Sequence, residues 1–101
     1  MIEIENIKKY RKKPVMIEAI QFRKDNIREV LEFITPQFSI YKKEVIDEME
    51  ERIKQKRYLT IRTLEGNLLV GYGSYILKGI QGEIYPCKKE IFEETYEEIL
   101  E

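Results

Sequence analysis

The order of apolar and polar residues divides the first half of the chain into one strand and two helices. Residues 14–22 carry β-branched and aromatic side chains on both faces and begin with a proline. We expect a strand there that is buried on much of both faces. Apolar residues recur at helical spacing in residues 26–35 and again in about 43–55, with charged residues between them. These two segments are predicted to be amphipathic helices, each with one face against a sheet.

Local signals place the ends of the first helix. Asn26 followed by Glu29 has the form of a capping box, and Pro36 ends the segment. The apolar stripe of this helix should lie in the core together with the strand residues. The expected core is Val15, Ile17, Ile27, Val30, Leu31, Ile34, Leu59, Ile61 and Ile76.

The second half of the chain is mostly β. Residues 58–63 and 68–70 are predicted to form a hairpin around a turn at 64–67, and residues 75–78 and 83–85 a second pair around Gly79 and Gly82. Apolar doublets from residue 91 to residue 100 predict a C-terminal helix. One helical turn followed by an edge strand at 95–97 fits the same residues.

These elements predict a small single α+β domain over residues 1–101, with a mainly antiparallel β-sheet and two to three helices. Within it, residues 1–13 are expected to form a basic, flexible arm. The small core and the aromatic and β-branched residues of the second half indicate a homo-oligomer, with a dimer expected first.

Charge and composition exclude several classes of protein. Eighteen basic and nineteen acidic residues leave a net charge of −1, so no general field attracts long nucleic acid or an anionic membrane. Apolar runs are far shorter than the roughly 20 residues of a membrane span, and no apolar region of a secretory signal follows the basic residues near the start. We expect a cytoplasmic protein.

The chain contains no histidine and one cysteine, Cys87. Histidine is the commonest general base and transition-metal ligand, so we expect no enzyme activity, no metal and no cofactor. Cys87 has no partner for an internal disulfide and is read as a small, semi-buried side chain. The glutamates near the C-terminus are read as the solvated face of a helix rather than as a cation site.

The candidate binding site lies in residues 71–88. Glycines at 71, 73, 79 and 82 either let backbone N–H groups approach an anion or relieve turns and bulges. Tyrosines could stack on a nucleobase while basic residues pair with phosphates, although cross-strand aromatic pairs need the same residue types. The predicted ligand-binding residues are Arg62, Tyr72, Tyr75, Lys78, Tyr85 and Lys88. Strict alternation points Tyr72 and Tyr75 to opposite faces, so Gly73 would have to form a bulge to bring them together.

Four stretches carry a family resemblance. They read YRKKPVMIEAIQF at residues 10–22, TLEG at 63–66, GSYILKGIQGEIYPCK at 73–88 and IFEETYE at 91–97. In this order they resemble a widespread group of small, uncharacterised phage and prophage proteins. The resemblance covers about half of the chain and implies a phage origin, with the host cytoplasm as the site of action. It carries over no catalytic residue.

A phage origin favours a counter-defence role. The leading hypothesis is a non-enzymatic binding protein that sequesters a small nucleotide immune signal, either a cyclic oligonucleotide or an ADP-ribose-type molecule. The alternative is a protein inhibitor or adaptor of anti-CRISPR type that binds a host defence protein through an edge strand or the acidic C-terminal face.

Overall fold

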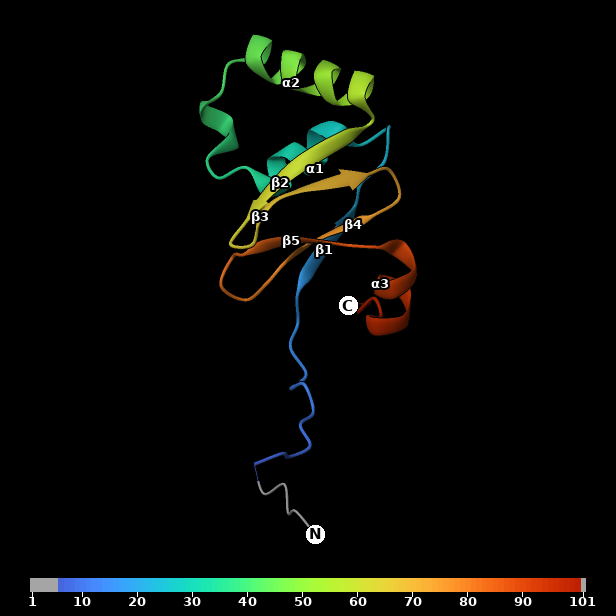
Figure 1. Ribbon diagram of the computed structural model, residues 1–101. Coiled ribbons are helices and arrows are strands. Elements are labelled where there is room, and N and C mark those ends of the chain that lie inside the picture. Colours follow the sequence, from blue (N-terminus) through green and yellow to red (C-terminus); the bar gives the residue numbers. More distant parts are fainter. Residues whose placement is uncertain (1–5, 101) are drawn as a thin grey trace.

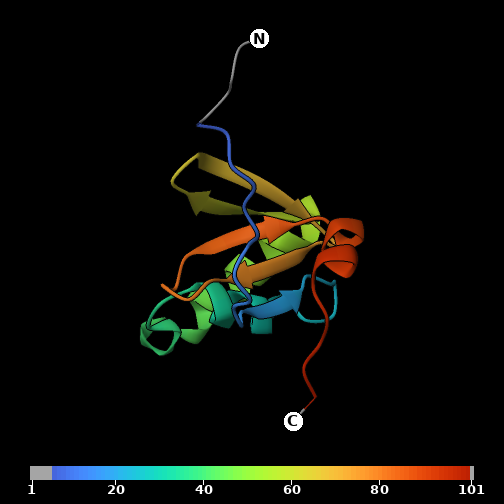
Figure 2. The ribbon, with the colours of Figure 1, turned by 90° about the horizontal axis from the view of Figure 1, so that it is seen from below.

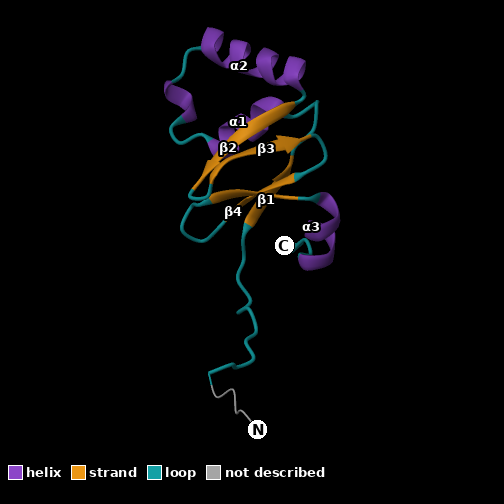
Figure 3. Ribbon diagram, viewed as in Figure 1, coloured by secondary structure: helices purple, strands orange, loops and turns teal. Residues whose placement is uncertain are grey.

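The structure is a computed structural model that describes residues 6–100. These residues form an α+β fold, as predicted (Figures 1 and 3). The strands are β1 (Glu18–Gln21), β2 (Tyr58–Thr63), β3 (Gly66–Gly71), β4 (Tyr75–Lys78) and β5 (Ile84–Cys87). The helices are α1 (Ile27–Ile34), α2 (Lys43–Lys56) and α3 (Lys89–Thr95), with a 3₁₀ turn, η1 (Phe38–Ile40), between the first two.

The strands form two antiparallel sheets instead of the single sheet expected from residues 14–22 and 58–86. One sheet has the order β1-β4-β5, and the hairpin β2-β3 is the other. Strand β2 lies beside β5 without pairing to it. Pro86 in β5 has no N–H to donate to a further strand, which suits its place on a sheet edge.

The turn of the β2–β3 hairpin is shorter than predicted. Thr63 pairs directly with Gly66, so only Leu64 and Glu65 connect the strands. The Thr63 hydroxyl accepts a hydrogen bond from the Glu65 N–H (3.1 Å) and donates one to the Gly66 carbonyl (2.8 Å). Gly66 has φ +111°, a conformation that other residues rarely adopt, so the glycine is required there.

Most of the predicted core is confirmed. Phe22, which follows β1, and buried side chains of α1, β2, β3 and β4 meet in one cluster: Phe22, Ile27, Val30, Leu31, Leu59, Ile61, Val70 and Ile76. Ile34 is partly buried and packs against this cluster. Figure 1 shows α1 and the two sheets around this core, with α2 outermost. Val15 is 45% exposed and Ile17 is only partly buried, so their placement in the core was wrong.

The first strand begins at Glu18, four residues later than predicted, because its partner strand β4 ends opposite this residue. Glu18 pairs with Lys78, the last residue of β4, and the chain then turns at Gly79. Residues 14–17 have no strand opposite them and continue as an extended arm.

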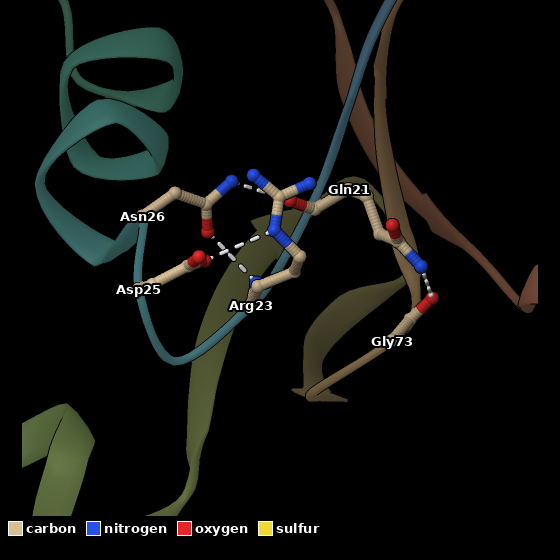
Figure 4. Close-up of polar contacts among 5 residues, drawn as sticks. All are labelled: Gln21, Arg23, Asp25, Asn26 and Gly73. Carbon is tan, nitrogen blue, oxygen red and sulfur yellow. Dashed lines mark hydrogen bonds and ion pairs between the residues drawn. The ribbon is translucent and has the colours of Figure 1, made fainter.

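Asn26 precedes α1 but does not cap it, so the capping-box prediction was wrong. The side chain is buried and bonds backward: its Oδ1 accepts from the Arg23 N–H (2.8 Å), and its Nδ2 donates to the Gln21 carbonyl (2.7 Å) (Figure 4). Gln21 in turn donates from Nε2 to the Gly73 carbonyl (3.1 Å). These bonds tie the end of β1 to the start of α1 and to the loop before β4.

Helix α2 lies where predicted and extends one residue further. It contacts α1 and β2 with the face that carries the buried Ile46 and the partly buried Met49 and Ile53. Arg28 of α1 forms ion pairs with Asp47 and Glu50 of α2. The two helices therefore share an apolar contact and a charged rim.

Helix α3 differs from both structures predicted for the C-terminus, which were a helix over residues 91–100 and one helical turn followed by an edge strand at 95–97. It has seven residues and ends at Thr95, and Tyr96 is already extended (φ −124°, ψ 151°). Residues 96–100 follow as a tail that pairs with no strand of the described chain. The doublet at Ile99 and Leu100 is exposed, and of the earlier doublets only Phe92 and Tyr96 are partly buried.

Candidate functional site

The structure does not bring the six predicted ligand-binding residues together. Arg62 is exposed on the outer side of the β2–β3 hairpin, between the inward-facing Ile61 and the turn. Lys88 is exposed at the residue before α3. These two residues and the other four lie on different elements and faces, so the six do not line one common surface.

Tyr72 belongs to the core side of the molecule. Its ring lies 4.9 Å from that of Phe22. Its hydroxyl is buried and has no hydrogen-bond partner among the described residues. Gly73 has φ +96° and bonds to Phe22 through its N–H (2.7 Å), yet this bend does not turn Tyr72 toward Tyr75.

Lys78 also faces away from the tyrosines of its sheet. Its ammonium lies 4.4 Å from the centre of the Phe33 ring, which belongs to α1. A cation over an aromatic face is attracted by the ring quadrupole. The charge of Lys78 is therefore used within the fold, although the residue borders the groove described below.

Tyr75 and Tyr85 do share a face. In the β4–β5 register Tyr75 stands opposite Cys87 and Leu77 opposite Tyr85, and paired or alternate residues lie on one side of a sheet. Burial raises the pKa of the Tyr85 phenol above its usual value of 10.0, and the neighbouring Tyr96 phenol raises it further. Tyr85 therefore stays a neutral donor under physiological conditions.

Phe92 and Tyr96, which belong to the doublets predicted to pack a C-terminal helix, complete an aromatic row. The Tyr75 ring stacks on Phe92 at 3.9 Å with 14° between the planes, and Phe92 lies 5.2 Å from Tyr96. Phe92 and Tyr96 are four residues apart, so one helical turn places them in line. Their spacing was a visible signal for this row, but a packed helix predicts the same spacing.

The row forms one wall of a groove of about 880 Å³, here called the aromatic groove. Residues 15–17 of the arm, strand β1 and residues 97–99 of the tail also line it. Tyr75, Phe92 and Tyr96 are all partly exposed. Figure 2 shows the arm and the tail that border this region leaving the domain in different directions.

The charges around the aromatic groove are mixed. Arg23 borders it and pairs with Asp25 (3.0 Å), while Glu18, Glu97 and Glu98 contribute carboxylates. Lys12 of the arm donates a hydrogen bond to the Tyr96 hydroxyl (3.5 Å), with its ammonium 5.7 Å from the ring centre. Stacking surface is therefore abundant here, whereas positive charge is scarce.

The glycines serve turns, and their backbone N–H groups are largely occupied. Gly79 donates to the Glu83 carbonyl (2.9 Å), Gly82 donates to the Gly79 carbonyl (3.0 Å), and the Gln81 N–H binds the Glu83 carboxylate (3.0 Å). A Cβ on Gly79 would meet the end of the Glu83 side chain, so a larger residue there would displace this carboxylate from the Gln81 N–H. The loop thus binds its own carboxylate, so we assign it no anion site.

Residues 6–100 contain no cluster of three carboxylate or cysteine side chains arranged to hold a metal ion. Cys87 is a free, partly buried thiol on β5. None of the helices within this range is long and apolar enough to cross a membrane. Comparison with protein-family models, with curated proteins and with solved structures finds no match to this chain.

Proposed function

We propose that the protein is a non-enzymatic binding protein that captures a small nucleotide in the aromatic groove. The observation that carries the proposal is the row Tyr75–Phe92–Tyr96 on the wall of a groove of about 880 Å³. Ligand sites have volumes of roughly 300–1,000 Å³ and combine apolar walls with a few polar groups. The aromatic groove meets both conditions.

Each part of a nucleotide has a counterpart in the aromatic groove. A base would stack at the Tyr96 end of the row, because every base offers a π face and stacking is worth about 1–3 kcal/mol. The carboxylate of Glu97 would accept hydrogen bonds from ribose hydroxyls. Lys12 and Arg23 would pair with phosphate oxygens.

The resemblance to phage and prophage proteins supplies the biological setting of this proposal. A nucleotide immune signal of cyclic oligonucleotide or ADP-ribose type would be sequestered in the host cytoplasm as a counter-defence. The lack of histidine in the chain supports capture without turnover.

Calorimetric titration with cyclic di- and trinucleotides and ADP-ribose tests the proposal. Wild-type protein is expected to bind at least one compound, and Tyr96→Ala to weaken that binding tenfold or more through lost stacking. Tyr58→Ala is the matched control, since Tyr58 lies on the hairpin β2–β3. Lys12→Ala should weaken binding, whereas Lys78→Ala should not, because its ammonium lies over Phe33. Absence of binding to every compound, or full binding by Tyr96→Ala, would reject the site.

A protein partner at the outer edge of β1 is a second candidate, favoured by the position of that strand. β1 pairs only with β4 within the described chain, so its other edge offers backbone groups to an added strand. The Phe22 N–H bonds the Ser74 carbonyl on the β4 side (2.8 Å), so by alternation the Ala19 N–H points outward. Ala19→Pro should abolish partner binding, since proline has no N–H to donate to the added strand.

A further inference from the structure

The arm that precedes β1 has side chains that its own domain leaves unused. Residues 6–17 are extended and lead away from the body (Figures 1 and 2). Ile7 is 73% exposed, Tyr10 87% and Met16 72%. The radius of gyration is 17.4 Å and the longest dimension 67 Å, whereas a compact domain of this length has a radius of about 13 Å.

The charges of the arm and of the C-terminal segment are complementary. The arm carries Lys8, Lys9, Arg11, Lys12 and Lys13 within six residues. The exposed side of α3 and the tail carry Glu90, Glu93, Glu94, Glu97 and Glu98. Among the described residues, Lys12 is the one arm cation with a hydrogen bond to this segment in its own chain, through the Tyr96 hydroxyl. Lys8, Lys9 and Arg11 precede Lys12 in the arm and are exposed.

We propose that two copies of the chain exchange arms, so that the arm of each copy lies along α3, the tail and the aromatic groove of the other. Such a contact is isologous and closes as a two-fold dimer. It covers Ile7, Tyr10 and Met16 with the partner's surface, and it places the basic residues against the glutamates. The arm of a second copy of this chain therefore lies along the edge of each aromatic groove.

This inference rests on the proposed function, because the exchanged arm supplies the positive charge that the aromatic groove lacks. Carboxylates outnumber cations on its lining, and Lys78 is already placed over Phe33. The exchanged arm brings further ammonium and guanidinium groups beside Tyr96, where the phosphates of a bound nucleotide would lie. The expected ligands are therefore nucleotides with two or more phosphate charges. The aromatic row of one copy would contact such a nucleotide together with the arms of both copies.

Sedimentation equilibrium of two charge-reversed variants tests the exchange. One variant reverses the arm (Lys8→Glu, Lys9→Glu, Arg11→Glu), and the other reverses the acidic side (Glu93→Lys, Glu94→Lys, Glu98→Lys). Wild type should sediment as a dimer of 12.2 kDa chains, and each variant alone as a monomer. An equimolar mixture should restore the dimer, since each reversed surface then meets its complement. A control with Lys24→Glu, Lys42→Glu and Lys43→Glu should remain dimeric, and circular dichroism verifies that all variants are folded.

Three results would overturn the arm exchange: a monomeric wild type, dimeric single variants, or a mixture that stays monomeric. The same proteins separate this failure from failure of the proposed function. If the nucleotide site is right but the exchange is wrong, ligand binds a monomer, and the arm-reversed variant, which keeps Lys12, binds the ligand as wild type does. If the exchange is right but the nucleotide site is wrong, the dimer forms and no compound binds it.

Discussion

At the residue scale, the most informative side chain is Asn26, which serves tertiary structure instead of helix capping. It is buried and satisfies one backbone donor and one backbone acceptor on the segment between β1 and α1. A buried polar group without its partner costs about 1–3 kcal/mol. The position therefore fixes how the first strand enters the first helix.

Replacing Asn26 with Ala is expected to lower the free energy of unfolding by about 2–4 kcal/mol, since both backbone partners lose their bonds. Chemical denaturation of wild type and variant measures the difference. Asn67→Ala, at an exposed position of β3, should change stability by less than about 0.5 kcal/mol. Equal effects at the two positions would contradict the role assigned to Asn26.

Tyr85 gives a prediction at high pH. Burial raises its pKa in the folded protein, so above pH 10.0 the unfolded chain ionises this phenol before the folded protein does. Its contribution to stability is complete below the unfolded pKa and is lost as pH rises through the folded pKa. In a spectrophotometric titration of tyrosinate, Tyr85→Phe should remove a late-titrating phenol. Loss of an early-titrating one would contradict the assigned environment.

At the element scale, the sequence predicted segments with a clear apolar period and failed where tertiary pairing decides the outcome. The stripe of α1 and the alternation of β2 reported directly which residues are buried. The start of β1 depends on where β4 ends, and no local pattern of residues 14–17 contains that information. For the site, Tyr75 and Phe92 lie on different elements, so their stacking follows from the position of α3 beside β4. The contacts of Tyr72 and Lys78 with Phe22 and Phe33 could not be predicted from local sequence, because these partners come from distant parts of the chain.

The packing of α1 is tested by Leu31→Ala. Leu31 is buried in the main cluster, so its removal should cost about 2–5 kcal/mol through lost transfer energy and a residual cavity. Ile40→Ala, in the exposed 3₁₀ turn, is the matched control with an expected change below about 0.5 kcal/mol. Thermal or urea unfolding compares them. A loss under half a kcal/mol at Leu31 would place α1 outside the core.

At the scale of the whole molecule, opposite charges nearly cancel but are unevenly placed. The net charge is −1, while the basic arm and the acidic C-terminal segment stand at separate places on the surface. Long-range steering of an anion is weak in such a molecule, so the affinity for the proposed nucleotide would have to come from local contacts in the aromatic groove.

Salt should therefore weaken nucleotide binding only modestly. A ligand with two phosphate charges is expected to lose less than about tenfold in affinity between 50 and 200 mM salt, whereas proteins with 6–10 phosphate contacts lose about 10³–10⁵. Titrations of the same compound at several salt concentrations give the slope. A loss of a hundredfold or more would indicate a polyanion site and contradict local recognition.

The central claim is that Tyr75, Phe92 and Tyr96 contact a bound nucleotide. Nuclear magnetic resonance of protein with labelled tyrosine and phenylalanine rings tests it most directly, because a stacked base shifts the ring signals of the residues it covers. On addition of a cyclic dinucleotide or ADP-ribose, saturable shifts are expected at these three rings, largest at Tyr96 and absent at Tyr58. Unchanged ring signals with every compound, or shifts confined to Tyr58 and Tyr72, would contradict the account.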